Sequence, residues 1–251
     1  MGLLVIVGIA AYIAYTIFFG GDKGYDTYKG MLTPTMRFIG AAGYNTYRNA
    51  DCNGIDVGGM YVCSWSKKHM KKLLKSGWGV KSREDLEATI SWLFNEGHNS
   101  ECMQLMQAYK EDPEKKSIKN KQKKIFEKLC SEYEKQGILA WDLCRVCNVA
   151  GWGFLAGYIS YKEAIKISVD ACKLLQSYYS SWDNMMGSYF CGLAYWNGPS
   201  KTSAESRANM YYETRNNEDS IYNISWNTDL SAEDYIMPRT NDSKNIKLLS
   251  E

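Results

Sequence analysis

Three polar residues, His98, Asp142 and Arg145, have the side-chain types needed for acid–base chemistry or anion binding. An imidazole and a carboxylate can exchange protons with a substrate, and a guanidinium can hold an anion. The alternative role is structural. Asp142 and Arg145 stand three residues apart and can pair within one helix, while His98 follows Gly97 and can cap the end of a predicted helix. We expect the structural role, because ion pairs inside a core often imitate active sites.

The spacing of Cys144 and Cys147 is that of a redox motif, but their context differs from it. A thioredoxin-like pair lies at the start of a helix after a strand, whereas these two fall within a predicted helix. No second cysteine or histidine pair has the spacing of zinc ligands. The sequence also contains no phosphate-binding loop, dinucleotide fingerprint, HExxH motif or nucleophile elbow. We therefore expect buried, reduced thiols, with no metal and no cofactor.

Apolar residues recur at helical spacing over residues 61–197, with short turns between the runs. Ser82 and Ser160 are each followed by an acidic residue three positions later, as at the start of a helix. The pattern predicts a mostly all-α, multi-helix, bundle-like domain.

The segment 138–152 is apolar on nearly every face, which is typical of the central helix of a bundle. Its polar residues, Asp142, Arg145 and Asn148, fall on one side of the helix together with Trp141 and Trp152. We expect a narrow polar strip along an otherwise buried helix.

Two segments flank this domain. Residues 23–60 contain seven glycines within Gly24–Met60 and no sustained helical period, so we expect an irregular connector that docks through Met31–Leu32 and Phe38–Ile39. Residues 198–251 are polar, and we expect an irregular C-terminal extension that is partly docked and whose last dozen residues are not ordered.

Residues 3–19 carry no charge and are long enough to cross a bilayer with little tilt, so residues 1–22 are predicted to be a transmembrane anchor. A cleaved signal peptide is the alternative, but Met1-Gly2 supplies no basic side chain and Phe18-Phe19-Gly20 is a poor cleavage site. Lys23, Lys29 and Arg37 follow the segment. The expected protein is a single-pass membrane protein whose C-terminal domain faces the cytoplasm.

The overall charge of the chain offers no field for nucleic acid. The 251 residues include 30 basic and 28 acidic side chains, for a net charge of +2. Seven lysines lie between Lys115 and Lys128, close to Glu114 and Glu127. We interpret this stretch as the solvated face of a long helix, against the alternative of a surface for anionic lipid or nucleic acid.

Several spaced aromatic and glycine positions carry a family resemblance. They are Trp78-Gly79-Val80, Trp92-Leu93 with Glu96-Gly97-His98, Ala140-Trp141-Asp142-Leu143 with Arg145, Gly157-Tyr158-Ile159, Ser181-Trp182, and Tyr189 with Gly192 and Trp196. Over about residues 61–197 the chain resembles the bacterial domain-of-unknown-function 1266 family. The resemblance implies a helical domain of unsettled activity and carries over no catalytic residue, and the anchor and the tail after Asn197 are expected to lie outside it.

Two hypotheses for function follow. The first, which we favour, is a membrane-tethered, non-catalytic interaction or accessory module, for instance of the immunity type, that holds a protein partner. The second is an enzyme or small anionic-ligand binder that uses His98, Asp142 and Arg145. A pocket that opens onto these side chains would favour the second hypothesis, and a closed, fully paired strip would favour the first.

Overall fold

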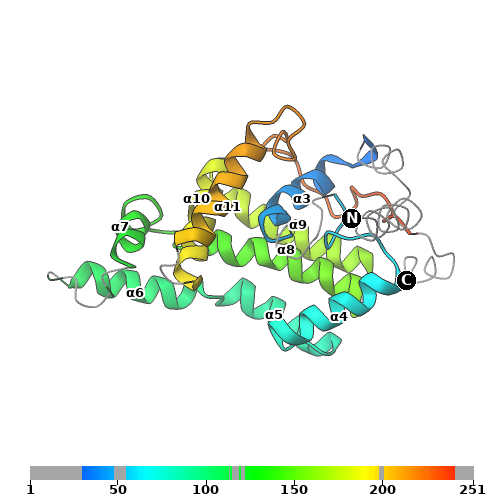
Figure 1. Ribbon diagram of the computed structural model, residues 1–251, viewed down its shortest axis with the longest axis horizontal. Coiled ribbons are helices and arrows are strands. Elements are labelled where there is room, and N and C mark those ends of the chain that lie inside the picture. Colours follow the sequence, from blue (N-terminus) through cyan, green and yellow to red (C-terminus); the bar gives the residue numbers. More distant parts are fainter. Residues whose placement is uncertain are drawn as a thin grey trace, which may run out of the picture.

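The computed structural model describes residues 30–47, 55–112, 114, 119, 122–197 and 201–240, and within them it is mostly helical (Figure 1). The predicted all-α class is confirmed for this part of the chain. Outside the helices, the described residues contain one isolated bridge, between Val62 and Thr240. The helices are α3 (Pro34–Tyr47), α4 (Ser64–Trp78), α5 (Arg83–Asn95), α6 (Asn99–Glu111), α7 (Lys123–Glu132), α8 (Leu139–Ala156), α9 (Tyr161–Tyr178), α10 (Trp182–Asn197) and α11 (Lys201–Arg215).

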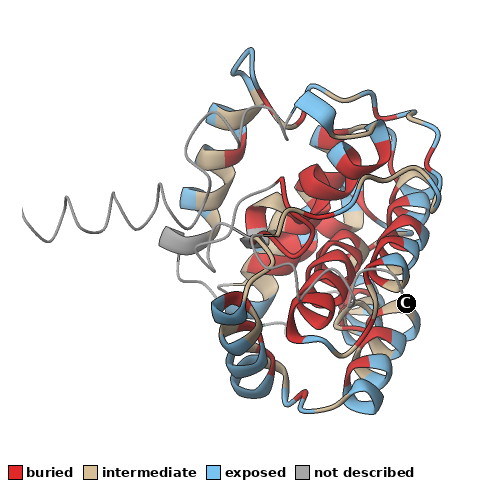
Figure 2. Cartoon of the chain, turned by 90° about the vertical axis from the view of Figure 1, so that its right-hand side faces the viewer, coloured by how far each residue is buried: buried red, intermediate tan, exposed pale blue. Residues whose placement is uncertain are grey.

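Helix α8 is the centre of the fold. Every residue from Ala140 to Ala156 is buried, and α3, α4, α5, α9 and α10 all pack against it. Figure 2 shows the buried residues concentrated on this inner helix and on the inward faces of those around it. The sequence predicted a central helix here, and the structure extends it from residue 152 to Ala156 because Gly157 adopts the left-handed conformation (φ 79°) that ends it.

Two glycines let neighbouring segments approach α8 closely. A Cβ atom on Gly151 would lie 2.4 Å from the backbone nitrogen of Gly58, and one on Gly153 would lie 2.3 Å from Leu86 of α5. Larger residues at either position would push these segments away from the helix.

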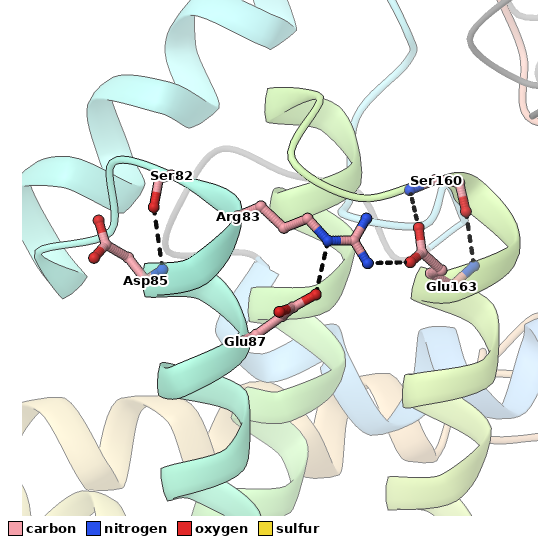
Figure 3. Close-up of polar contacts among 6 residues, drawn as sticks. All are labelled: Ser82, Arg83, Asp85, Glu87, Ser160 and Glu163. Atoms are coloured by element: carbon pink, nitrogen blue, oxygen red, sulfur yellow. Dashed lines mark hydrogen bonds and ion pairs between the residues drawn. The ribbon is translucent and has the colours of Figure 1, made fainter.

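Side-chain caps fix the starts of α5 and α9 (Figure 3). Ser160 and Glu163 form the predicted capping box. Ser82 accepts a hydrogen bond from the Asp85 backbone, but the Asp85 carboxylate binds the Lys81 N–H instead of returning to Ser82, so this cap is one-sided. Arg83 then joins the two helices by binding Glu163 of α9 at 2.5 Å.

The expectation of an irregular connector over residues 23–60 is wrong for residues 34–47, which form α3. Nearly every face of α3 is buried, with Arg37 exposed, so no polar stripe marks the helical period. Phe38 and Ile39 are buried as expected, whereas Met31 is 59% exposed.

The expectation of an irregular C-terminal tail is wrong for residues 201–215, which form α11. This helix is mostly polar and is fixed by Tyr211, a buried side chain whose hydroxyl donates to Asp183 of α10 at 2.5 Å. The chain then returns across the domain and buries Tyr222, Trp226 and Leu230. The core therefore extends beyond residues 61–197 on both sides.

The long helix expected across the lysine-rich stretch Lys115–Lys128 begins later than predicted. Helix α7 starts at Lys123, and Glu114 lies in a turn where its N–H binds the Asp112 carboxylate at 3.0 Å. The predicted anchor, residues 3–19, and the last dozen residues apart from Thr240 fall outside the described residues. Among those described, no helix combines the length and apolar character needed to span a bilayer.

Candidate functional site

A cavity of about 580 Å³ opens beside the polar strip of α8. Its volume is within the range of small-molecule sites. The ends of α4 and α10 border it, together with residues from α5, α8 and α11. We call it the tryptophan cavity, because its lining includes Trp78, Trp92, Trp141, Trp152 and Trp196, along with Tyr189, Leu193, His98, Arg145 and Arg207.

Asp142 is fully buried behind this cavity and caps the start of α6. Its Oδ1 accepts a hydrogen bond from the His98 backbone at 3.2 Å, and its Oδ2 accepts one from the Asn99 backbone at 2.8 Å. Arg145 pairs with Oδ1 as well. A carboxylate is favourable at a helix N-terminus, where unpaired N–H groups and the helix dipole attract negative charge. Both oxygens of Asp142 are therefore engaged by the protein.

Arg145 reaches from α8 to the cavity and is held in a fixed orientation. Its Nε donates to the Trp141 carbonyl at 3.1 Å and its Nη2 donates to Asp142, while Nη1 makes no hydrogen bond to any described residue. The guanidinium lies over the rings of Trp141 and Trp78, 4.7 and 5.5 Å from their centroids. One edge of a buried cation is thus left without a partner beside the cavity.

The His98 imidazole sits between two indoles of the cavity. Its ring centroid is 5.1 Å from that of Trp92 and 4.4 Å from that of Trp196. Burial, and after it the charge of Arg145, lower the pKa of His98, so the ring is neutral near pH 7. Trp196 is 57% exposed and contacts His98 from the end of α10.

Two buried indole N–H groups on the cavity lining have no acceptor among the described residues, those of Trp141 and Trp152. Elsewhere the same fold satisfies this group. Trp182 donates to the Ile224 carbonyl and Trp226 to the Tyr179 carbonyl, each at 2.9 Å. A buried donor without an acceptor costs about 1–3 kcal/mol. The two unpartnered indole N–H donors therefore belong to the same cavity as the unpartnered Nη1 edge of Arg145.

The structure brings the three predicted site residues together, in unequal roles. His98 and Arg145 line the cavity, whereas Asp142 lies behind it and links the two. Asn148, the third polar residue of the strip, instead donates to the Gly43 carbonyl of α3 at 3.2 Å. Sequence reasoning missed Arg207, which reaches the cavity from α11 while also donating to the Asn45 carbonyl. No local signal connects Arg207 with α8.

The cysteines of α8 are buried thiols. Burial raises the pKa of Cys144 well above its usual value, and the sulfur of Cys147 lies 3.8 Å from that of Cys172. In the described part of the chain, no cluster of three or more histidine, cysteine and acidic side chains could hold a metal ion.

Comparison with known proteins identifies relatives without an assigned activity. A family model described as "Protein of unknown function (DUF1266)" matches residues 73–226. Two similar proteins of Escherichia coli (strain K12) are uncharacterised. YbeR is 25% identical over an alignment of 179 positions, which covers 61% of this chain and 75% of YbeR. YbeU is 26% identical over an alignment of 132 positions, which covers 49% of this chain and 56% of YbeU.

No solved structure matches the chain. The family match corrects one expectation from the sequence. It runs past Asn197 to residue 226 and so includes α11, whereas the tail had been expected to lie outside the family.

Proposed function

The chain belongs to the DUF1266 family, whose function is unknown, and we propose that its helical domain binds a small organic anion in the tryptophan cavity. The observation that carries this proposal is the unpartnered Nη1 of Arg145 at a cavity whose lining also includes the unpartnered indole donors of Trp141 and Trp152. An anion is the partner that a guanidinium edge and N–H donors have in common. The two indole nitrogens are shielded from solvent, so reaching them requires a small movement of the side chains that cover them.

The side chains that line the tryptophan cavity are better suited to ligand binding than to catalysis. Both oxygens of Asp142 are occupied, so this carboxylate is not free to exchange protons. The described lining contains no carboxylate, thiol, amine or aliphatic hydroxyl. His98 would have to act without an orienting group or a nucleophile, unlike the arrangements that acid–base and covalent catalysis use.

Anilinonaphthalene sulfonate, a flat organic anion, provides a direct test. Titration of the full chain should give saturable fluorescence at one site, with binding weakened about tenfold or more in Arg145→Lys, which keeps the charge but loses the planar fork. Arg83→Lys, at an exposed arginine that is not part of the cavity lining, is the matched control. Equal affinity in both variants would refute the proposal.

Trp152→Phe provides a second variant, because it keeps an aromatic ring in the cavity wall while removing one unpartnered donor. It should also weaken binding. Thermal melts of every variant establish that the protein compared is folded.

A membrane-tethered interaction or accessory role, for instance of the immunity type, is a second candidate. The charge-free residues 3–19 and the lysines after them favour it, since an anchor would hold the domain on the cytoplasmic side beside a protein partner. We propose that this anchor is not cleaved. Fractionation should leave the full-length chain in the membrane after high-pH carbonate extraction. Release of the intact chain would refute the anchor, and a shortened N-terminus would establish a signal peptide.

A further inference from the structure

We infer that the tryptophan cavity selects aromatic monocarboxylates, meaning a flat ring that bears a single carboxylate. This inference rests on the proposed function and narrows the class of anion. Three features of the cavity support it: the aromatic walls, the balance of charge, and the orientation of the helix ends around it.

The walls favour a flat ring. Five indoles and the ring of Tyr189 line the cavity. The cavity also already holds flat groups against its aromatic rings: the guanidinium of Arg145 lies over Trp78 and Trp141, and the imidazole of His98 packs against Trp92 and Trp196. A planar ligand ring can make the same stacked or edge-on contacts.

The charges around the cavity favour one negative charge on the ligand. Arg145 is paired with buried Asp142, so the two together contribute no net charge. Arg207 has a neutral partner, the Asn45 carbonyl, and keeps its positive charge. His98 is neutral near pH 7. The charged side chains of the lining, counted together with Asp142, therefore carry one positive charge in excess, and the charge of Glu101, which also acts on His98, adds no positive charge. A dianion would bring a negative charge that these residues do not compensate.

The helix ends argue against a phosphate. Phosphate sites commonly use the free N–H groups at a helix N-terminus, but at the start of α6 the N–H groups of His98 and Asn99 are already bound by Asp142. Helices α4 and α10 reach the cavity with their C-termini, at Gly77 and Trp78 and at Trp196 and Asn197. Helix C-termini carry partial negative charge, which penalises a dianion more than a monoanion.

The remaining donors match a carboxylate. One oxygen can accept from Nη1 of Arg145, and the other can accept from an indole N–H of Trp141 or Trp152. The ring that carries the carboxylate then lies among the indoles.

Four probes separate the parts of this inference in calorimetric titrations of the full chain near pH 7. Naphthoate should bind at least about tenfold more tightly than each of the other three probes. Naphthamide lacks the charge, naphthyl phosphate carries more charge, and decanoate lacks the ring. Arg207→Gln should weaken naphthoate binding, whereas Arg83→Gln, at the exposed surface, should not.

Several results would overturn the inference. If naphthyl phosphate binds as tightly as naphthoate, the preference for a monocarboxylate is refuted. If decanoate binds as tightly, the preference for an aromatic ring is refuted. Anion binding at this cavity would stand in both cases. If naphthoate does not bind but anilinonaphthalene sulfonate still binds in an Arg145-dependent way, only the ligand class is refuted. Equal binding of naphthamide and naphthoate would refute anion recognition itself.

Discussion

The Asp142 carboxylate accepts a hydrogen bond from the Asn99 backbone at 2.8 Å and so ties the start of α6 to the first turn of α8. The same side chain pairs with Arg145, one helical turn further along α8. Burial raises the pKa of Asp142 and lowers the pKa of Arg145, while each charge partly offsets the effect on the other. One residue thus caps a helix, compensates a buried cation and orients the guanidinium at the cavity.

Removal of this carboxylate should destabilise the domain strongly. We predict that Asp142→Ala lowers the free energy of unfolding by about 3–5 kcal/mol, because it leaves a buried guanidinium without a counter-charge. Asp170→Ala is the control, since it breaks an exposed pair with Lys166 and should cost at most about 1 kcal/mol. Urea unfolding measures both values. Asp142→Ala and Arg145→Met variants that melt at or above the wild-type temperature would refute a stabilising role for the pair.

The position of Gly97 next to this carboxylate gives a second prediction. Gly97 has a φ of 56°, and a Cβ atom there would lie 2.2 Å from Oδ2 of Asp142. Gly79 has a φ of 72° but nothing within 4 Å of its Cβ position. Gly79→Ala should therefore cost only the backbone strain, about 1–2 kcal/mol, and Gly97→Ala should cost more. Equal losses in denaturant unfolding would show that the Asp142 contact does not constrain position 97.

The unpartnered indole of Trp152 gives a third prediction. Trp226→Phe removes a donor from the Tyr179 carbonyl and leaves that carbonyl unpaired, whereas Trp152→Phe removes a donor that had no acceptor. Both substitutions lose a similar ring area in buried sites. We therefore expect Trp226→Phe to be the more destabilising by about 1–3 kcal/mol. If Trp152→Phe lowers the melting temperature at least as much as Trp226→Phe, the Trp152 N–H has an acceptor in solution.

Glu163 should make stability depend on pH. The hydrogen bond from Arg83, followed by that from the Ser160 backbone, lowers the pKa of Glu163 from 4.5 to about 2. The folded protein therefore holds this carboxylate charged where the unfolded chain protonates it, so its contribution is complete above about pH 4.5 and is lost as the pH falls toward 2.

Glu163→Gln should accordingly be less stable than wild type at pH 7 and approach it near pH 2. The side chain is 38% exposed, so solvent screening limits the difference to about 1 kcal/mol or less. Thermal melts across this range measure it. Asp170→Asn, on the outer face of α9, serves as the surface control, and a difference for Glu163→Gln that does not change with pH would contradict the ion-pair explanation.

The lysine-rich stretch Lys115–Lys128 should not bind nucleic acid, because acidic residues lie beside it. We expect the full chain to show no salt-dependent DNA binding in fluorescence anisotropy. Salt-dependent binding that disappears when Lys123 and Lys124 are replaced by Gln would refute this, while the same replacements should leave thermal stability nearly unchanged.

The sequence by itself determined the features that depend on local spacing. The central helix α8 is visible as an unbroken apolar segment, the i, i+3 spacing predicts the Asp142–Arg145 pair, and the Ser160–Glu163 box marks the start of α9. It failed for α3 and α11, because α3 is buried on nearly every face and α11 is polar on nearly every face. A helix of either kind lacks the amphipathic stripe that reveals its period.

Tertiary structure alone decided what the polar strip faces. Asp142 caps α6, more than forty residues earlier in the chain, and Arg207 joins the cavity from a helix beyond α10. Trp78, Trp92 and Trp196 come from three different helices and meet only because α4, α5 and α10 all pack on α8. Periodicity specifies which face of each helix is buried, but not which helix covers it. The cavity therefore follows from the packing of whole helices and not from the spacing of residues within one.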